Sequence, residues 1–308
     1  MKRKILITGS SGLVGTALTA ALLAKGNEVI KFDLREQGAS RGDVLDYASV
    51  NNIVSGIDGI VHLAAVSRVV WGELNPELCW ATNVGGLRNV ISAATQSPRK
   101  PWLVFASSRE VYGQPIALPA TEDVQLSPVN IYGRSKVAGE LLVAEARSAG
   151  FRACTIRLSN VFGTTADHAD RVVPAFARAA ALGEELRVDG LNHTFDFTHI
   201  DDVTRGIVTL IKLLETGEAL PPPIHFVSGR PTTLGELASL AVRLGHPGAS
   251  IRTAAPRNFD VARFYGDPLR AKTLLDWQPL VQLEDGVARL IKAFRNVHQA
   301  NDADKLSR

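Results

Sequence analysis

Short apolar runs alternate with longer amphipathic stretches through the first half of the chain. The runs are apolar at successive positions, as is typical of parallel strands that are buried on both faces. The stretches between them, chiefly 76–94 and 131–149, have the length and composition of helices. This rhythm predicts an α/β fold with a doubly wound parallel sheet and right-handed crossovers. The predicted strands are 4–8, 28–33, 59–64, 101–106 and 153–158.

Beyond about Gly163 the rhythm weakens, and shorter elements are predicted. The consecutive prolines at 221–223 exclude both a helix and a central strand. After them, Thr233 and Glu236 have the spacing of a capping box and predict the start of a helix that ends near Leu244. The other predicted elements are helices at 174–182, 201–214 and 283–294, a short strand at 186–188 and a run at 195–200.

The composition excludes several classes of protein. The formal net charge is +3 and the Lys and Arg residues are scattered, so no basic stripe for nucleic acid is expected. Cys79 and Cys154 lie in apolar runs, which predicts buried thiols of a cytoplasmic protein and argues against a disulfide or a zinc site. The apolar stretch after the basic start is too short for a secretion signal, and no run of about 18 apolar residues occurs. We therefore expect no metal, nucleic-acid or membrane partner.

A glycine-rich turn follows the first predicted strand and opens the first predicted helix. Gly9, Gly12 and Gly15 permit a tight turn, a close approach of the backbone to a pyrophosphate and close helix packing. Asp33 ends the second predicted strand, where a ribose 2′-hydroxyl would need an acceptor. A carboxylate there repels a 2′-phosphate and favours NAD over NADP, although Arg35 would attract that phosphate. The loop alone is also compatible with an ordinary turn.

A candidate for proton transfer lies in the first turns of a predicted helix. Tyr132 and Lys136 are four residues apart and share one helix face. A phenol has an ordinary pKa of about 10, and a nearby cation lowers it so that the group can take a proton from a hydroxyl. Ser107 and Ser108 end a buried strand at the sheet edge that binds ligands in open α/β folds. Each feature alone is commonplace, but together they predict an active site.

These motifs resemble those of the extended short-chain dehydrogenase/reductases, and among them the NAD-dependent nucleotide-sugar epimerases and dehydratases. The resemblance runs from Ile5 to about Phe294. Residues 42–44 are similar to the adenine-contacting Gly-Asp-Val of that family, and 62–65 to its pyrophosphate-side strand end. Residues 108–113 resemble the segment that carries the active-site hydroxyl, which points to Ser108 rather than Ser107.

The resemblance implies a role for each motif. Tyr132 would be the general base, Lys136 would tune it and bind the nicotinamide ribose, and Ser108 would align the reacting hydroxyl. NAD would oxidise the sugar to a keto-sugar. The cofactor-binding residues that it implies are Gly9, Ser11, Gly12, Leu13, Val14, Gly15, Asp33, Asp43, Val44, Leu63, Ala64, Ala65, Asn83, Ser107, Tyr132 and Lys136. The substrate-binding residues are Ser67, Ser108, Arg109, Glu110, Asn160, Arg171, Val172, Arg187 and Arg257, with Asn160 and Arg257 on the diphosphate.

The chain departs from the family pattern at two places. Dehydratases of the family usually carry Thr-Asp-Glu before Val-Tyr-Gly, with the Asp as acid, whereas this chain has Ser108, Arg109 and Glu110. An arginine cannot donate a proton at neutral pH, which argues against a dehydratase. Glu110 takes the place of the dehydratase base, with a structural ion pair as the alternative interpretation. Phe195 replaces an arginine that often contacts the nucleotide.

The resemblance also implies the domain organisation. We expect a Rossmann-like domain at 1–163, to which 193–220 return, and a smaller C-terminal α+β lobe for the substrate at 164–192 and 221–300, followed by a flexible tail at 301–308. The leading hypothesis is a 4-epimerase of a UDP-hexose or UDP-uronic acid. A dehydratase, reductase or dehydrogenase of a related sugar is the alternative, and a cofactor-sensing protein without turnover is a third. A homodimer is expected from the family alone.

Overall fold

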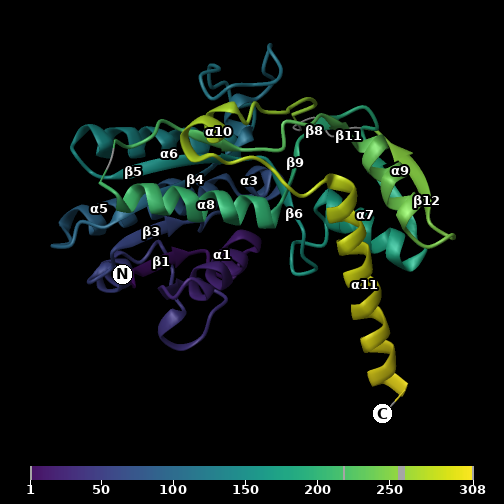
Figure 1. Ribbon diagram of the computed structural model, residues 1–308, viewed down its shortest axis with the longest axis horizontal. Coiled ribbons are helices and arrows are strands. Elements are labelled where there is room, and N and C mark those ends of the chain that lie inside the picture. Colours follow the sequence, from purple (N-terminus) through teal and green to yellow (C-terminus); the bar gives the residue numbers. More distant parts are fainter. Residues whose placement is uncertain (1, 218, 256–260, 307–308) are drawn as a thin grey trace.

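A six-stranded parallel sheet lies at the centre of the larger part of the molecule (Figure 1). The structure, a computed structural model, describes residues 2–217, 219–255 and 261–306. The strand order is β2-β1-β3-β4-β5-β10, and every neighbouring pair is parallel. The predicted doubly wound sheet is thus confirmed. Its strands are β1 (Lys4–Thr8), β2 (Glu28–Phe32), β3 (Gly59–His62), β4 (Trp102–Ser108), β5 (Ala153–Leu158) and β10 (Ile224–Phe226).

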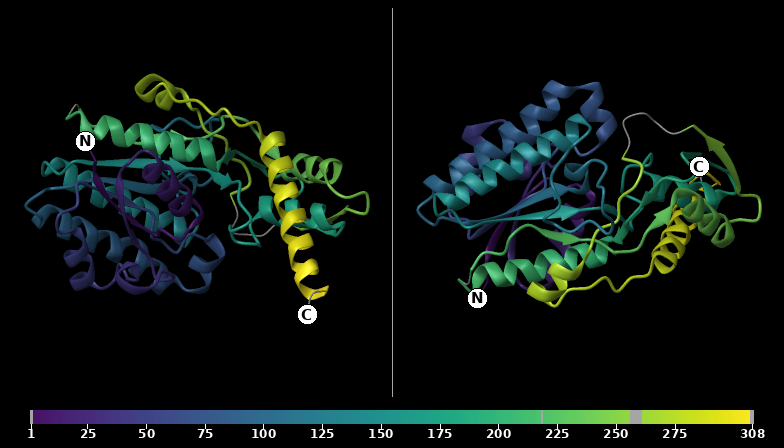
Figure 2. Two further views of the ribbon diagram at one scale, coloured as in Figure 1. Left: turned by 60° about the horizontal axis from the view of Figure 1, so that its bottom comes forward. Right: turned by 90° about the horizontal axis from the view of Figure 1, so that it is seen from above.

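Helices cover both faces of this sheet (Figure 2). Because side chains alternate along a strand, Ile5 and Ile7 pack into the core beneath one helix layer, and Leu6 packs into the core beneath the other. The first layer contains α1 (Leu13–Ala24), α8 (Ile200–Glu215) and α10 (Leu269–Leu275). The second contains α2 (Tyr47–Val54), α5 (Leu87–Gln96) and α6 (Ile131–Ser148). Cys79 and Cys154 are buried free thiols, as predicted.

A smaller lobe with its own apolar core lies beside the sheet (Figure 1). Phe176, Leu237 and Leu290 come from its three helices and meet in that core. The predicted capping box is confirmed, since the Thr233 and Glu236 side chains each bond the other's backbone N–H. The helices are α7 (Val172–Leu182), α9 (Leu234–Leu244) and α11 (Leu283–Leu306). The paired strands are β6 (Asn160–Phe162) with β9 (Phe197–His199), β7 (Glu185–Asp189) with β12 (Ser250–Ala254), and β8 (Thr194–Phe195) with β11 (Thr232–Thr233).

The division between sheet and lobe differs from the predicted one. Residues 221–300 were all assigned to the lobe, yet β10 is the edge strand of the large sheet and α10 packs against α8. Ile224 and Phe226 are fully buried there. The sequence gives no sign of this burial, because the strand is short and follows three prolines. Conversely, the return to the sheet begins only with α8, because Phe195 and Phe197 pack into the lobe core.

Several helices also differ in extent. The helix predicted at 76–94 is divided into α4 (Pro76–Trp80), a π-helical turn η2 (Ala81–Gly86) and α5. The short helix α3 (Val69–Leu74) precedes it and was not predicted. The last helix, α11, begins at the predicted residue and continues to Leu306 rather than ending near Phe294.

The topology determines where a ligand can bind. Strand β1 lies between β2 and β3. After β1 the chain crosses towards β2, and after β3 it crosses the other way, towards β4. In doubly wound sheets this divergence opens a crevice at the carboxyl edge. The glycine turn after β1 and the serines at the end of β4 both lie at that edge. No helix within the described ranges is long and apolar enough to cross a membrane.

Candidate active site

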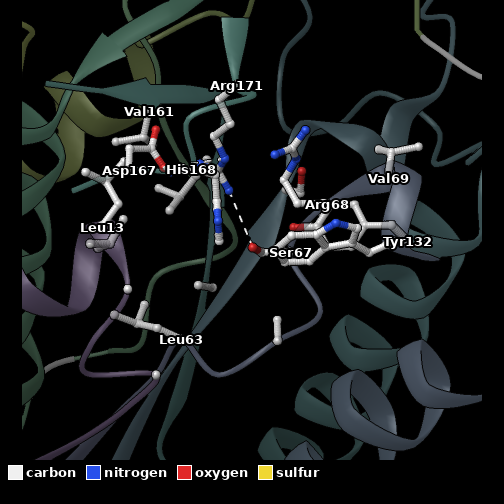
Figure 3. A pocket seen from close by; sticks show the side chains of 18 of the residues that line it. Leu13, Leu63, Ser67, Arg68, Val69, Tyr132, Val161, Asp167, His168 and Arg171 are labelled. Carbon is white, nitrogen blue, oxygen red and sulfur yellow. Dashed lines mark hydrogen bonds and ion pairs between the residues drawn. The ribbon is translucent and has the colours of Figure 1, made fainter. Parts of the chain in front are cut away.

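A cavity of about 720 Å³ extends from the glycine turn along the carboxyl edge of the sheet to the lobe (Figure 3). It brings together most of the residues that the sequence singled out. These are Gly9, Gly12, Leu13, Val14, Gly15, Asp33, Asp43, Val44, Leu63, Ala64, Ala65, Ser67, Ser107, Ser108, Arg109, Glu110, Tyr132, Lys136, Asn160, Arg171, Val172 and Arg187. Ser11 and Asn83 are not among the lining residues, and Arg257 lies outside the described residues.

The glycine turn has the shape that a pyrophosphate requires. Gly9 has a φ of 72°, and a Cβ on it would lie 2.6 Å from the backbone nitrogen of Ala64. A Cβ on Gly15 would lie 2.3 Å from the carbonyl oxygen of Gly9. Helix α1 begins after Gly12 without a side-chain cap, so its first N–H groups are available at the cavity. Both side-chain clashes are with backbone, which explains why the turn uses glycine.

Asp33 follows β2 directly and contacts this turn. Its carboxylate accepts hydrogen bonds from the backbone N–H groups of Ser11 at 3.1 Å and Arg35 at 2.9 Å. The Arg35 guanidinium also bonds to this carboxylate, at 3.4 Å. The Ser11 hydroxyl donates to Glu36 at 2.8 Å, which explains why its side chain does not line the cavity. The Asp33 carboxylate thus orders the turn from within the cavity wall.

Ser108, Tyr132 and Lys136 converge at the end of β4. All three are buried, and the Ser108 hydroxyl acts to lower the pKa of the Tyr132 phenol. The ammonium of Lys136 donates to the Ala106 carbonyl at 2.8 Å and lies 5.7 Å from the centre of the Tyr132 ring. Asn130 positions this part of α6, because its side chain caps the helix by accepting the Gly133 N–H at 2.7 Å. The predicted trio is therefore assembled in one place.

The electrostatics of the trio correct one prediction. Burial raises the pKa of the Tyr132 phenol to about 12, whereas the Ser108 hydroxyl and the Arg171 guanidinium act to lower it. The sequence predicted a lowered pKa, with Lys136 as the cause. In the structure the ammonium bonds to a backbone carbonyl, and burial lowers its own pKa to about 8. Desolvation thus favours the neutral phenol more strongly than the neighbouring cations oppose it.

Two predicted cofactor contacts have other partners. The Ser107 hydroxyl donates to the buried carboxylate of Glu140 at 2.5 Å. The Asn83 side chain lies in the π-helical turn, accepts the Val66 N–H at 2.8 Å and donates to the Ser135 hydroxyl at 2.9 Å. Asn83 therefore holds the loop after β3 against α6, and its own side chain does not line the cavity. The sequence had indicated Asn83 only through the family resemblance, and as a cofactor contact.

Arg109 and Glu110 form a buried ion pair of 2.8 Å. Glu110 also accepts a hydrogen bond from Asn130 at 2.8 Å, so it supports the cap of α6. The Arg109 guanidinium lies 4.6 Å from the centre of the Phe195 ring, and its Nη1 has no hydrogen-bond partner. The alternative interpretation of Glu110 as a structural partner thus agrees with the geometry. Arg109 covers the position at which Phe195 replaces the usual arginine of the family.

The lobe side of the cavity combines two predicted residues, Ser67 and Arg171, with others that the sequence did not single out. Arg171 points across it and donates to the Ser67 hydroxyl at 3.4 Å (Figure 3). Arg68 pairs with Asp170, and His168 packs edge-on against Trp71 at 4.8 Å. Together these contacts join the loop after β3 to the loop before α7. Arg68, Trp71, His168 and Asp170 were not predicted, because the segments around them carry no recognisable sequence pattern.

Further polar groups on this side have defined partners. Arg187 is paired with Asp189 at 2.8 Å, and the Asn160 amide donates to the Asp196 carbonyl at 3.3 Å. The Asp167 carboxylate is buried, and one of its oxygens has no hydrogen-bond partner. No cluster of three or more His, Cys, Asp or Glu side chains suited to a metal is present in the described part of the chain.

Known proteins resemble the chain over nearly its whole length. It is 30% identical to UDP-glucuronic acid decarboxylase 1 of Danio rerio, over 98% of this chain and 75% of that protein. It is 29% identical to UDP-glucose 4-epimerase of Mycolicibacterium smegmatis, over 96% of this chain and 100% of that protein. The solved UDP-glucose 4-epimerase of Brucella ovis, a complex with NAD, superposes with a TM-score of 0.84 at 25% identity, covering 95% of this chain and 98% of that one.

A family model covers the sheet and the site described above. Residues 5–227 match the NAD dependent epimerase/dehydratase family, and this match includes the glycine turn, the serines of β4 and the Tyr132–Lys136 pair. The sequence match and the fold agree with the resemblance found in the motifs. The chain belongs to the NAD-dependent epimerase/dehydratase family, whose members are extended short-chain dehydrogenase/reductases.

Proposed function

We propose that the protein is an NAD-dependent 4-epimerase of a nucleotide-diphosphate sugar, a UDP-hexose or UDP-uronate. The convergence of Ser108, Tyr132 and Lys136 beside a dinucleotide-shaped glycine turn carries this proposal. The names of the relatives support it, because a UDP-glucose 4-epimerase aligns over 96% of the chain. A protein that only sensed the cofactor would need the turn but not the trio.

The residues of the trio divide the chemistry between them. NAD, when bound, accepts a hydride from the sugar and returns it. Ser108 aligns the sugar hydroxyl. Tyr132 can take the proton of that hydroxyl only as a phenolate, which the positive charges of Lys136 and of the oxidised nicotinamide would favour once NAD is bound. Lys136 supplies a fixed positive charge beside the phenol and contacts the nicotinamide ribose. In epimerisation the keto-sugar rotates, and Tyr132 returns the proton as the opposite face is reduced, so that no net oxidation occurs.

The binding residues follow the same division. The N–H groups at the start of α1 receive the cofactor pyrophosphate, and Asp33 accepts a hydrogen bond from the adenosine ribose. Arg171 and Arg187 lie on the lobe side of the cavity, where their guanidinium groups suit the oxygens of the sugar diphosphate. The lobe would thus bind the nucleotide and present the sugar to the trio.

Arg109 and Glu110 oppose the dehydratase alternative. Elimination of water needs a group that can donate a proton at this position, and a guanidinium cannot. Glu110 is occupied by its ion pair with Arg109 and its hydrogen bond from Asn130. A carboxylate that holds both partners is unsuited to act as a base.

A decarboxylase of a UDP-uronate is the second candidate. Two of the relatives, from Xenopus tropicalis and Danio rerio, are UDP-glucuronic acid decarboxylases at 29% and 30% identity. Oxidation of a uronate at C4 places a ketone β to the carboxylate, and such an acid loses carbon dioxide readily. The same trio would therefore serve either reaction, and the fate of the keto-sugar distinguishes them.

Incubation with a panel of UDP-, dTDP- and GDP-sugars tests the proposal. An epimerase gives a product of unchanged mass and altered retention, with no net change in nicotinamide absorbance. Loss of carbon dioxide or of water from the product would establish the decarboxylase or the dehydratase instead. Stoichiometric reduction of NAD would establish a dehydrogenase, and no product from any sugar would refute the enzymatic proposal.

A further inference from the structure

A third contact between α6 and β4 follows the two made by Tyr132 and Lys136. Ser107 donates to Oε1 of Glu140 at 2.5 Å. Residues 132, 136 and 140 are successive turns of one helix face, so Glu140 extends the catalytic face by one turn. Glu140 is therefore attached to the same strand end as the two residues proposed for catalysis.

The Glu140 carboxylate is fixed from the side of the sheet. Arg157 donates to Oε1 at 2.9 Å through Nε and to Oε2 at 2.6 Å through Nη2. Arg157 lies on β5 directly beside Ser107, and its remaining nitrogen donates to the Tyr112 hydroxyl and the Glu122 carbonyl. The side chains of Arg157 and Glu140 are only 5% and 8% exposed. These bidentate hydrogen bonds leave the carboxylate little freedom to move.

Glu140 is also the charged neighbour of Lys136. Burial lowers the pKa of that ammonium, and Glu140 and Cys79 act to raise it. Burial raises the pKa of the Cys79 thiol, so this group is neutral near pH 7. His62 on β3 also interacts electrostatically with Lys136, and burial lowers the pKa of His62 to about 3, so it is neutral as well. Tyr132 is neutral for the reason given above. Glu140 lies four residues from Lys136 on the same face of α6, so its carboxylate, although paired with Arg157, opposes desolvation of the ammonium.

We propose that Glu140, held in place by its ion pair with Arg157, is a positioning residue of the active site. Through Ser107 it fixes where α6 lies along β4, and its negative charge keeps Lys136 protonated. This inference rests on the proposed function, because it assigns Glu140 a task in the chemistry of the trio. It differs from a merely structural role, which would affect folding but not the protonation of Lys136.

Titration of Lys136 tests the electrostatic part without any turnover. The full chain, loaded with NAD and labelled at its lysines, is followed by NMR as the pH rises, and the Lys136 signal is assigned from its absence in Lys136→Arg. We expect Glu140→Gln to lower the titration midpoint by about half a pH unit or more. Glu122→Gln is the matched control: this carboxylate is buried in the same network, accepts the His225 N–H at 2.9 Å and should leave the midpoint unchanged.

Kinetics test the positional part. Glu140→Gln should lower kcat by about tenfold to a hundredfold with little change in KM, and should move the alkaline limb of the pH profile to lower pH. Ser107→Ala keeps the charge but releases the strand, so it should lower kcat and leave that limb in place. Glu140→Asp provides a second variant that retains the charge, and it should preserve the midpoint while lowering kcat.

The outcomes separate this inference from the proposed function. An unchanged Lys136 midpoint in Glu140→Gln, or an equal shift in Glu122→Gln, overturns the electrostatic part. Unaltered kcat in both Ser107→Ala and Glu140→Asp overturns the positional part. A wild-type protein that converts no nucleotide sugar refutes the proposed function and with it the positional part, while the lysine titration still decides whether Glu140 maintains the charge.

Discussion

At the scale of single residues, the hydroxyl of Tyr132 is the atom on which the proposed chemistry depends. Replacing it in Tyr132→Phe removes the proton acceptor but keeps the buried ring, so kcat should fall by about 10²- to 10⁴-fold while NAD remains bound. Rates with the best nucleotide sugar and NAD retained on gel filtration are the measurements. Tyr47→Phe, which removes a hydroxyl that bonds to Gln96 at the surface, should have wild-type activity. Near-normal turnover of Tyr132→Phe would refute the assignment of the base.

The pH dependence of the reaction is a second residue-scale property. The pKa of Lys136 is lowered to about 8, so the ammonium loses its proton as the pH rises through that value. Because the proposed chemistry requires the charged form, kcat should decline on the alkaline side with a midpoint near 8. Initial rates at saturating substrate and constant ionic strength, taken from pH 6 to 10, measure this decline. Both limits of the range lie about two pH units from the expected midpoint. A profile that stays flat through this range would argue that Lys136 is not required in its charged form.

At the scale of elements, the cap of α6 connects helix stability to catalysis. Asn130 accepts the Gly133 N–H and donates to Glu110, so Asn130→Ala removes the cap and leaves a buried carboxylate oxygen without its donor. We expect unfolding free energy to fall by about 1–2 kcal/mol, together with a lower kcat, because Tyr132 lies in the first turn. Denaturant melts and rates measure both effects.

The cap of α4 provides the control for this element. Asn75 accepts the Leu78 N–H at 3.0 Å and caps that helix in the same way, but it is not a cavity residue. Asn75→Ala should therefore cost a similar free energy and leave kcat unchanged. If both variants lose the same activity, the cap of α6 has no special influence on the trio.

At the scale of the whole molecule, contacts between two loops close the cavity between the sheet and the lobe. Arg68 after β3 pairs with Asp170 before α7, and Asp170 is largely exposed. The Arg68 side chain is only 11% exposed, but the carboxylate of Asp170 remains in contact with solvent, so the pair should add about 1 kcal/mol or less to stability and Asp170→Asn should change the melting temperature little. It should nevertheless speed ligand release and raise KM severalfold, because the pair joins two loops that line the cavity proposed to bind the substrate.

Stopped-flow measurement of ligand release tests this whole-molecule prediction. Glu184→Gln serves as the control, since it removes an exposed ion pair with Arg178 that lies in the lobe alone. That variant should release ligand at the wild-type rate. Equal release rates for Asp170→Asn and the wild type would show that the Arg68 contact does not retain the substrate.

Local sequence determined the fold class and identified the trio proposed for catalysis. Buried parallel strands must be apolar on both faces, glycine is required where a Cβ would strike backbone, and a spacing of four places Tyr132 and Lys136 on one helix face. These rules act over a few residues, so they can be read without coordinates. The same holds for the capping box at Thr233, which the structure reproduces.

The tertiary structure decided what depends on residues far apart in the chain. It placed β10 in the large sheet, set the Arg109–Glu110 pair beside Phe195, and joined Arg68 to Asp170 across the cavity. It also reversed the expected shift of the Tyr132 pKa, because burial is a property of the folded molecule and its energy outweighs that of a nearby cation. Spacing identifies which groups can meet, whereas packing determines how much water each one loses and therefore how it ionises.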